Sequence, residues 1–346
     1  MKKAGNLDLL DLLKLILSCM VVMIHTTFLG PYNAYIYPAV RFAVPMFFMM
    51  TGYFSFRKID SLPTFSAQKK AVGKIVIRLL KLYLFWFVVL LPYTLYVRKY
   101  FAEGFGVGLL KMLRGFLFGS TFTASWYLMA CVLGILIVFF LSRKCSSRAL
   151  LWITVPVYLF ATLVSVTEKY ILASPSLNAP YQLLLSTLGY PYMGFLICLL
   201  YITLGKRIAE RAGERRTSDF LWLLCSLALL LAERWILGRF SWFNFRCDSC
   251  FFLAPATYYL LSFLMSFDVK ISCGPVLRSI STIIYCSHGI VMALVSKLIP
   301  LMKLEDPYNI WLFLLTVGIS ALCGLVILTA EHRGKGKIAS LLAYSH

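Results

Sequence analysis

The chain of 346 residues is 60% hydrophobic and only 14% charged, which is too apolar for a single soluble core. The excess apolar surface must therefore face lipid. A net charge of +20 is typical of nucleic-acid-binding proteins, but here Lys and Arg gather in alternate segments between apolar runs, as in membrane proteins. We expect a protein whose partner is membrane lipid and which binds no nucleic acid.

Apolar runs long enough to cross a bilayer follow one another along the chain. A helix needs about 20 residues to cross a hydrocarbon core of ~30 Å. The runs are continuously apolar, without the alternation of barrel strands, so they predict helices. The expected fold is an all-α, polytopic transmembrane helical bundle of about ten spans that forms a single domain over residues 1–346. The predicted spans are 7–29, 35–56, 74–96, 125–141, 149–166, 184–204, 219–237, 251–267, 279–301 and 309–330.

The distribution of basic residues predicts the orientation. Of the 34 Lys and Arg residues, 22 fall on the side of the N-terminus, ten on the opposite side, and two within spans. Because Lys and Arg favour cytoplasmic loops, this bias predicts a multi-pass cell-membrane protein with both termini in the cytoplasm. A cleaved signal peptide is the alternative for the first run, but no small-residue cleavage site follows it. The stretch 97–124 suits either an interfacial segment on the outer leaflet or a plain loop.

The cysteines do not indicate a metal site. Cys247 and Cys250 form an isolated CxxC in a predicted outer loop. A disulfide or incidental spacing is the better interpretation, because a zinc site needs a second pair of ligands. The sequence also lacks P-loop, HExxH and GxSxG patterns, which leaves nucleotide, zinc-protease and hydrolase functions without support. We expect no metal, and chemistry based on polar groups within spans.

The first predicted span contains Asp11, Lys14 and His25. Ionisable groups in hydrocarbon are costly and are retained where they are paired or used. Along a helix, the rotation about the axis from Lys14 to His25 exceeds three full turns by only about 20°. The two side chains therefore share one face of the helix and stand about 16 Å apart along it. A two-ended substrate would fit along that face, with Asp11 placed to pair with Lys14. The alternative is that Lys14 snorkels to the headgroups and His25 makes one interhelical hydrogen bond.

The second predicted span runs antiparallel to the first and begins with Arg41. Rise per residue places Arg41 at a depth similar to that of His25, so the two side chains are expected to meet. Pro45 removes one helical hydrogen bond and favours a kink that opens space beside them. The alternative for Arg41 is an interfacial pairing with lipid phosphate.

Together these residues carry a family resemblance. Asp11-x-x-Lys14-x10-His25, followed by Arg41-x3-Pro45 and Phe47-Phe48-x-x-Thr51-Gly52-Tyr53, resembles the opening of the acyltransferase 3 family, the membrane-embedded O-acyltransferases of cell-surface glycans. Ser125-Trp126-Tyr127-Leu128 resembles the family's Leu-Trp-Phe-Leu, and Tyr285-x-x-His288 its late Tyr-x-x-His. Arg78-Leu79-Leu80-Lys81 departs from the usual Arg-x-x-Arg, and a Lys lacks the bidentate fork of Arg.

The resemblance implies transfer of an acyl group from cytoplasmic acyl-CoA, with acetyl-CoA favoured, to a hydroxyl of a cell-surface or lipid-linked glycan. It implies a stand-alone form without an SGNH esterase domain. In this scheme His25 acts as general base and Arg41 orients His25 or stabilises the oxyanion. The expected binding groups for coenzyme A phosphates are Lys14, Arg78 and Lys81.

Two further residues are weaker candidates. Trp126 is suited to stacking on a sugar, but the aromatic belt of a membrane protein explains it better. His288 is the other histidine within a span, and one interhelical hydrogen bond explains it about as well as a role in the site. Two other function classes stay open: a transporter or flippase for a lipid-linked or small polar substrate, and a non-catalytic membrane sensor.

Overall fold

The computed structural model describes residues 7–211, 218–240, 243, 249–267, 269–334 and 337–346, and the regular secondary structure within these ranges is entirely helical. The polytopic helical bundle expected from the sequence is confirmed. The α-helices are α1 (Leu7–Thr26), α2 (Asn33–Val40), α3 (Ala43–Ile59), α4 (Phe65–Arg98), α5 (Phe105–Phe118), α6 (Trp126–Lys144), α7 (Ser147–Ala173), α8 (Pro175–Leu188), α9 (Phe195–Glu210), α10 (Ser218–Arg239), α11 (Leu253–Leu264), α12 (Gly274–Leu301), α13 (Ile310–Arg333) and α14 (Lys337–Leu342).

In the described part of the chain, eight helical stretches are long and apolar enough to cross a membrane, with Tyr35–Ile59 counted as one stretch. The other two predicted spans correspond to shorter helices, α9 with 16 residues and α11 with 12. The predicted bounds 184–204 are wrong, because the chain leaves α8 at Gly189 and enters α9 after Gly194, two glycines with positive φ. Since α9 packs against α3, α6 and α7, it does not have to match the thickness of the bilayer by itself.

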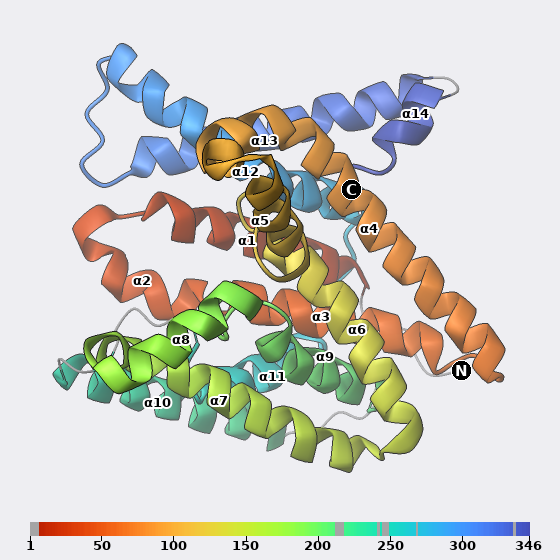
Figure 1. Ribbon diagram of the computed structural model, residues 1–346. Helices are drawn as coiled ribbons and strands as arrows, with labels where there is room; N and C mark the ends of the chain where they lie inside the picture. The colour runs from red at the N-terminus through yellow and green to blue at the C-terminus, as the bar shows by residue number, and fades with distance from the viewer. Residues whose placement is uncertain (1–6, 212–217, 241–242, 244–248, 268, 335–336) are drawn as a thin grey trace.

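Helices α1 and α3 lie at the centre of the bundle, with α12 and α13 on one side and α7, α10 and α11 on the other, while α4 crosses the bundle obliquely (Figure 1). The contact between α3 and α9 is close because of a glycine. A Cβ added at Gly52 would lie 2.5 Å from the carbonyl oxygen of Ile202. The glycine of the Thr51-Gly52-Tyr53 segment therefore lets two backbones touch.

Helix α4 begins earlier than the predicted span 74–96. The side chain of Thr64 caps the helix by accepting a hydrogen bond from the backbone N–H of Ala67 at 3.3 Å, as Thr commonly does at an N-cap. The 34 residues of α4 correspond to about 51 Å at 1.5 Å per residue. Lys69 and Lys70, which lie before the predicted span, are therefore carried on the first turns of the same helix as Lys74, Arg78 and Lys81.

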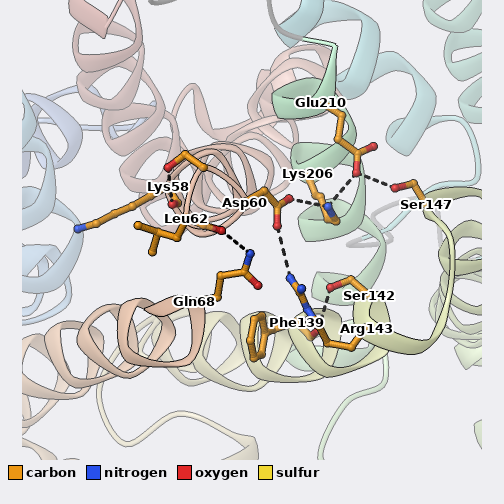
Figure 2. Close-up of polar contacts among 11 residues, drawn as sticks. Lys58, Asp60, Leu62, Gln68, Phe139, Ser142, Arg143, Ser147, Lys206 and Glu210 are labelled. Carbon is orange, nitrogen blue, oxygen red and sulfur yellow. Dashed lines mark hydrogen bonds and ion pairs between the residues drawn. The ribbon is translucent and has the colours of Figure 1, made fainter. Parts of the chain in front are cut away.

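Ion pairs and one hydrogen bond connect α3, α6, α7 and α9 near the end of α3 (Figure 2). The ammonium of Lys206, on α9, lies 2.6 Å from Asp60 at the end of α3 and 2.8 Å from Glu210. Asp60 also faces Arg143 of α6 at 3.7 Å, and Ser147 of α7 donates to Glu210 at 2.6 Å. The Lys206 side chain is only 9% exposed, so its two carboxylate partners offset the cost of burying its charge.

Candidate active site

A cavity of about 580 Å³ lies among α1, α3, α4, α6 and α12 in the N-terminal half of the bundle. Its wall is strongly basic, with two of the predicted donor-binding residues, Lys14 and Arg78, in the same cavity. The third, Lys81, does not line this cavity and instead lines a neighbouring one. Five cations line the larger cavity: Lys14, Lys58, Lys74, Arg78 and Arg278.

The Lys14 side chain is held by Asp11 on its own helix and by Phe54 on α3. Its ammonium lies 3.0 Å from Asp11, which confirms the predicted ion pair, and 4.6 Å from the centre of the Phe54 ring on α3. Asp11 also faces Arg278 of α12 at 3.7 Å. A carboxylate shared between two cations leaves net positive charge at the cavity wall, which favours an anionic ligand.

The deep part of the cavity is lined by hydroxyl and aromatic groups. The hydroxyls of Thr51 and Tyr127 are hydrogen-bonded to each other at 2.9 Å, and the Tyr285 hydroxyl donates to the Ala124 carbonyl at 2.7 Å. The Phe47 ring packs against both tyrosines. Phe47, Thr51 and Tyr285 lie inside the motifs quoted from the sequence, although no role was expected for them, and Tyr127 lies next to Trp126 in another of those motifs.

His25 and His288 lie side by side, with ring centroids 5.0 Å apart. Helices α1 and α12 lie side by side and run in the same direction. The chain just before α12 contacts the start of α1, where the backbone N–H of Ile271 donates to Asp8 at 3.2 Å, and the two imidazoles meet near the end of α1. This pair could not be predicted from the sequence, because it depends on the relative position of two helices that are distant along the chain.

The environment of His288 determines which ring nitrogen carries its proton. The side chain is fully buried, and its Nδ1 lies 2.7 Å from the carbonyl oxygen of Tyr285. A carbonyl only accepts, so Nδ1 is the donor and neutral His288 has a bare Nε2. Within the described residues Nε2 has no hydrogen-bond partner. His288 therefore presents a buried acceptor next to His25, which keeps exposed surface.

Arg41 lies in a break between two helices. The predicted span 35–56 is interrupted at Arg41 and Phe42, between α2 and α3. Pro45 causes no kink further on but lies in the first turn of α3, where its ring disfavours helical continuation through Arg41, four residues earlier. The guanidinium stacks on Tyr37 at 4.2 Å and lies within electrostatic range of His25. The buried Arg234 of α10 stacks on the same ring at 5.4 Å.

Trp126 lies outside the cavity, whereas its neighbour Tyr127 lines it. The indole packs 6.0 Å from the ring of Phe48 in the core of the bundle. The cavity also does not extend to His25 or His288. The nearest link is Tyr285, which lines the cavity and whose ring centroid lies 6.1 Å from that of His288.

These features define a class of protein: a multi-pass membrane protein with a basic cavity at one end and an imidazole pair beside its deep end. A family model described as an acyltransferase domain matches residues 7–330. The chain belongs to the acyltransferase 3 family, as its motifs indicated, and the family consists of membrane acyltransferases.

Curated relatives carry other names. An amino-acid racemase of Enterococcus faecalis is 24% identical over 340 residues, covering 94% of this chain and 46% of the relative. A serine/alanine racemase of Enterococcus gallinarum is 26% identical over 265 residues, covering 73% of this chain and 36% of the relative. The chain thus spans less than half the length of these relatives. No solved structure matches it.

Cys247, with the predicted outer CxxC, lies outside the described residues. The stretch 97–124 contains α5, whose apolar side chains are largely exposed, among them Phe105 and Leu110. Its two basic residues are both engaged: Lys111 pairs with Glu103 at 2.6 Å, and Arg114 donates to the carbonyl of Leu185 on α8. Exposed apolar and basic groups on one helix are typical of an interfacial segment.

Proposed function

We propose that this chain is an acyl-CoA-dependent O-acyltransferase of the cell membrane, with acetyl-CoA as donor and a hydroxyl of a cell-surface or lipid-linked glycan as acceptor. The observation that carries the proposal is the cavity itself. Its basic wall, formed in part by Lys14 and Arg78, suits the phosphates of coenzyme A, and its deep end approaches the imidazole pair through Tyr285. A donor entering at the basic end would direct its thioester towards that pair.

In the proposed reaction the acceptor O–H meets His25, whose ring is the more exposed of the two imidazoles. A ring nitrogen of His25 takes the proton while the oxygen attacks the thioester carbonyl carbon. The C–S bond then breaks, an ester forms, and the proton passes to the departing thiolate. The charge of Arg41 favours the negative charge that develops during attack.

We assign His288 a positioning role. Its bare Nε2 can accept a hydrogen bond from one nitrogen of His25, which would leave the other nitrogen of His25 unprotonated and aimed at the acceptor. In catalytic triads, too, a second group hydrogen-bonds to the base and fixes its orientation. Gly289 supports the arrangement, because a Cβ there would collide with Thr123 and push α12 away from the neighbouring loop.

The racemase names of the relatives suggest amino-acid chemistry as a second possibility. Racemisation with two bases requires them on opposite sides of the substrate carbon. The imidazoles of His25 and His288 are only 5.0 Å apart between ring centroids, which leaves no space for a carbon between them. The relatives are also more than twice as long as the matched region. The described site therefore favours acyl transfer.

Lys14 is expected to bind the donor through charge. Replacing Lys14 by Ala should raise the KM for acetyl-CoA about 10- to 150-fold, since a hydrogen bond to a charged group contributes about 1.5–3 kcal/mol, while Lys14→Arg should retain most of the affinity. Steady-state kinetics with a fixed acceptor concentration measure both values. An unchanged donor KM in Lys14→Ala would leave Lys14 with the snorkelling role only.

The orientation predicts which loops an impermeant thiol reagent reaches. In a variant without accessible native cysteines, Ser61→Cys, between α3 and α4, should be labelled only after the cells are permeabilised. Ser176→Cys, at the start of α8, should be labelled in intact cells. Both serines are exposed, so a difference in labelling reports the side of the membrane. The reverse pattern would contradict the cytoplasmic placement of the donor cavity.

A further inference from the structure

A second cavity, of about 350 Å³, adjoins the basic cavity and lies between α4 and the segment that follows α14. The two cavities share Lys74, Arg78 and His346 as lining residues. The smaller one is completed by Lys81 and by Tyr344, in the segment Ala343–His346 that follows α14. These three side chains form the boundary between the two cavities, and Ala343 and Tyr344 line only the smaller one.

Specific contacts fix the segment Ala343–His346 against the bundle. The indole of Trp86, on α4, donates to the carbonyl of Ser345 at 2.9 Å. The imidazole of His346 lies 3.4 Å from Glu331 on α13. Burial lowers the pKa of His346, whereas the neighbouring Glu331 carboxylate opposes that effect. His346 is therefore mostly neutral near pH 7, and the positive charge of the smaller cavity comes from its two lysines and Arg78.

Tyr344 holds Lys81 at the edge of the smaller cavity. The Lys81 ammonium donates to the Tyr344 hydroxyl at 3.2 Å and lies 4.5 Å from the centre of its ring. A flexible lysine held in this manner loses less conformational entropy when it binds an anion. The ring of Tyr344 is itself 37% exposed and can contact a planar base.

The two compartments differ in chemistry in the same way as the two halves of the proposed donor. Coenzyme A joins a nucleotide that bears all of the phosphates to a long pantetheine arm that bears no charge. The smaller cavity offers Lys74, Arg78, Lys81 and an aromatic ring. The larger one continues inward past apolar side chains such as Phe54 and Leu79 to Tyr127 and Tyr285.

We propose that the donor site is divided, with the 3′-phosphorylated adenosine nucleotide in the smaller cavity against Tyr344 and the pantetheine arm in the larger cavity. Arg78 lies at the boundary, where the pyrophosphate joins the two halves. Segment Ala343–His346 is thereby part of the substrate site, and Tyr344 is a positioning residue for Lys81. This inference rests on the proposed acyl-CoA dependence and adds the location of each half of the donor.

The test measures binding of donor fragments to the full chain, purified in detergent, by isothermal titration. The probes are coenzyme A, adenosine 3′,5′-bisphosphate and acetyl-pantetheine. Tyr344→Ala and Lys81→Ala should each weaken coenzyme A and the bisphosphate by about three- to ten-fold, the effect of losing one charge-assisted contact, and leave acetyl-pantetheine unchanged. Leu79→Ala, which changes only the larger cavity, should weaken acetyl-pantetheine and coenzyme A but not the bisphosphate.

Controls separate this inference from the proposed function. Tyr96→Ala removes an exposed tyrosine at the other end of α4 and should change no binding constant. Thermal unfolding of each variant shows whether it folds as the wild type does. If wild-type protein binds no coenzyme A, the proposed function fails. If it binds coenzyme A but Tyr344→Ala affects both fragments equally, neither fragment, or strengthens binding, the division of the donor site is wrong.

Discussion

Replacing His25 by Gln is expected to lower kcat for acyl transfer by about 10²–10⁴-fold, the range that general base catalysis contributes. Glutamine is similar in size and polar but accepts no proton near neutral pH. The donor KM should change little, because His25 lies outside the cavity proposed to bind the donor. Steady-state rates with acetyl-CoA, measured on protein of confirmed insertion and fold, give both constants.

The matched control for His25 is His332→Gln, which changes an exposed histidine at the end of α13. This variant should retain wild-type kcat. A His25→Gln protein that transfers acyl groups at a rate near that of the wild type would contradict the proposed mechanism, whatever the behaviour of the other variants.

His288 should have a smaller effect on kcat. Replacing His288 by Phe removes the acceptor offered to His25, and one hydrogen bond to a buried group contributes about 1–3 kcal/mol, or about 10–100-fold in rate. His288→Gln, which retains an acceptor oxygen, should lose less than His288→Phe. This order of variants distinguishes positioning from packing, because Phe fills the space at least as well as Gln. An unchanged kcat in His288→Phe would remove the positioning role.

Much of the fold could be predicted because lipid imposes a simple rule on composition and length. The rule fails where a helix is enclosed by protein. Helices α9 and α11 are shorter than a bilayer needs, and the break at Gly189 and Gly194 is hidden within apolar sequence. The rule also does not predict how far a helix extends beyond the bilayer. An example is α4, whose first half carries Lys74 and Arg78 of the cavity.

The site was predictable where its residues belong to one helix. The Asp11–Lys14 pair follows from a separation of one helical turn and is present at 3.0 Å. The pairing of His25 with His288 depends on how α1 and α12 pack, and the contact of Tyr344 with Lys81 depends on the packing of a distant segment against α4. Neither leaves a periodic signal in the sequence, because tertiary packing determines both.

The most direct measurement of the central claim uses inverted membrane vesicles, which present the cytoplasmic face to the medium. Acetyl-CoA labelled with radiocarbon in the acetyl group is added outside the vesicles, and the label is followed into alkali-labile ester on the glycan fraction. We expect label in that ester with wild-type protein and none above background with His25→Gln, although both proteins bind coenzyme A. Label that remains on coenzyme A, or appears only as free acetate with the wild-type chain, would contradict acyl transfer to a glycan hydroxyl.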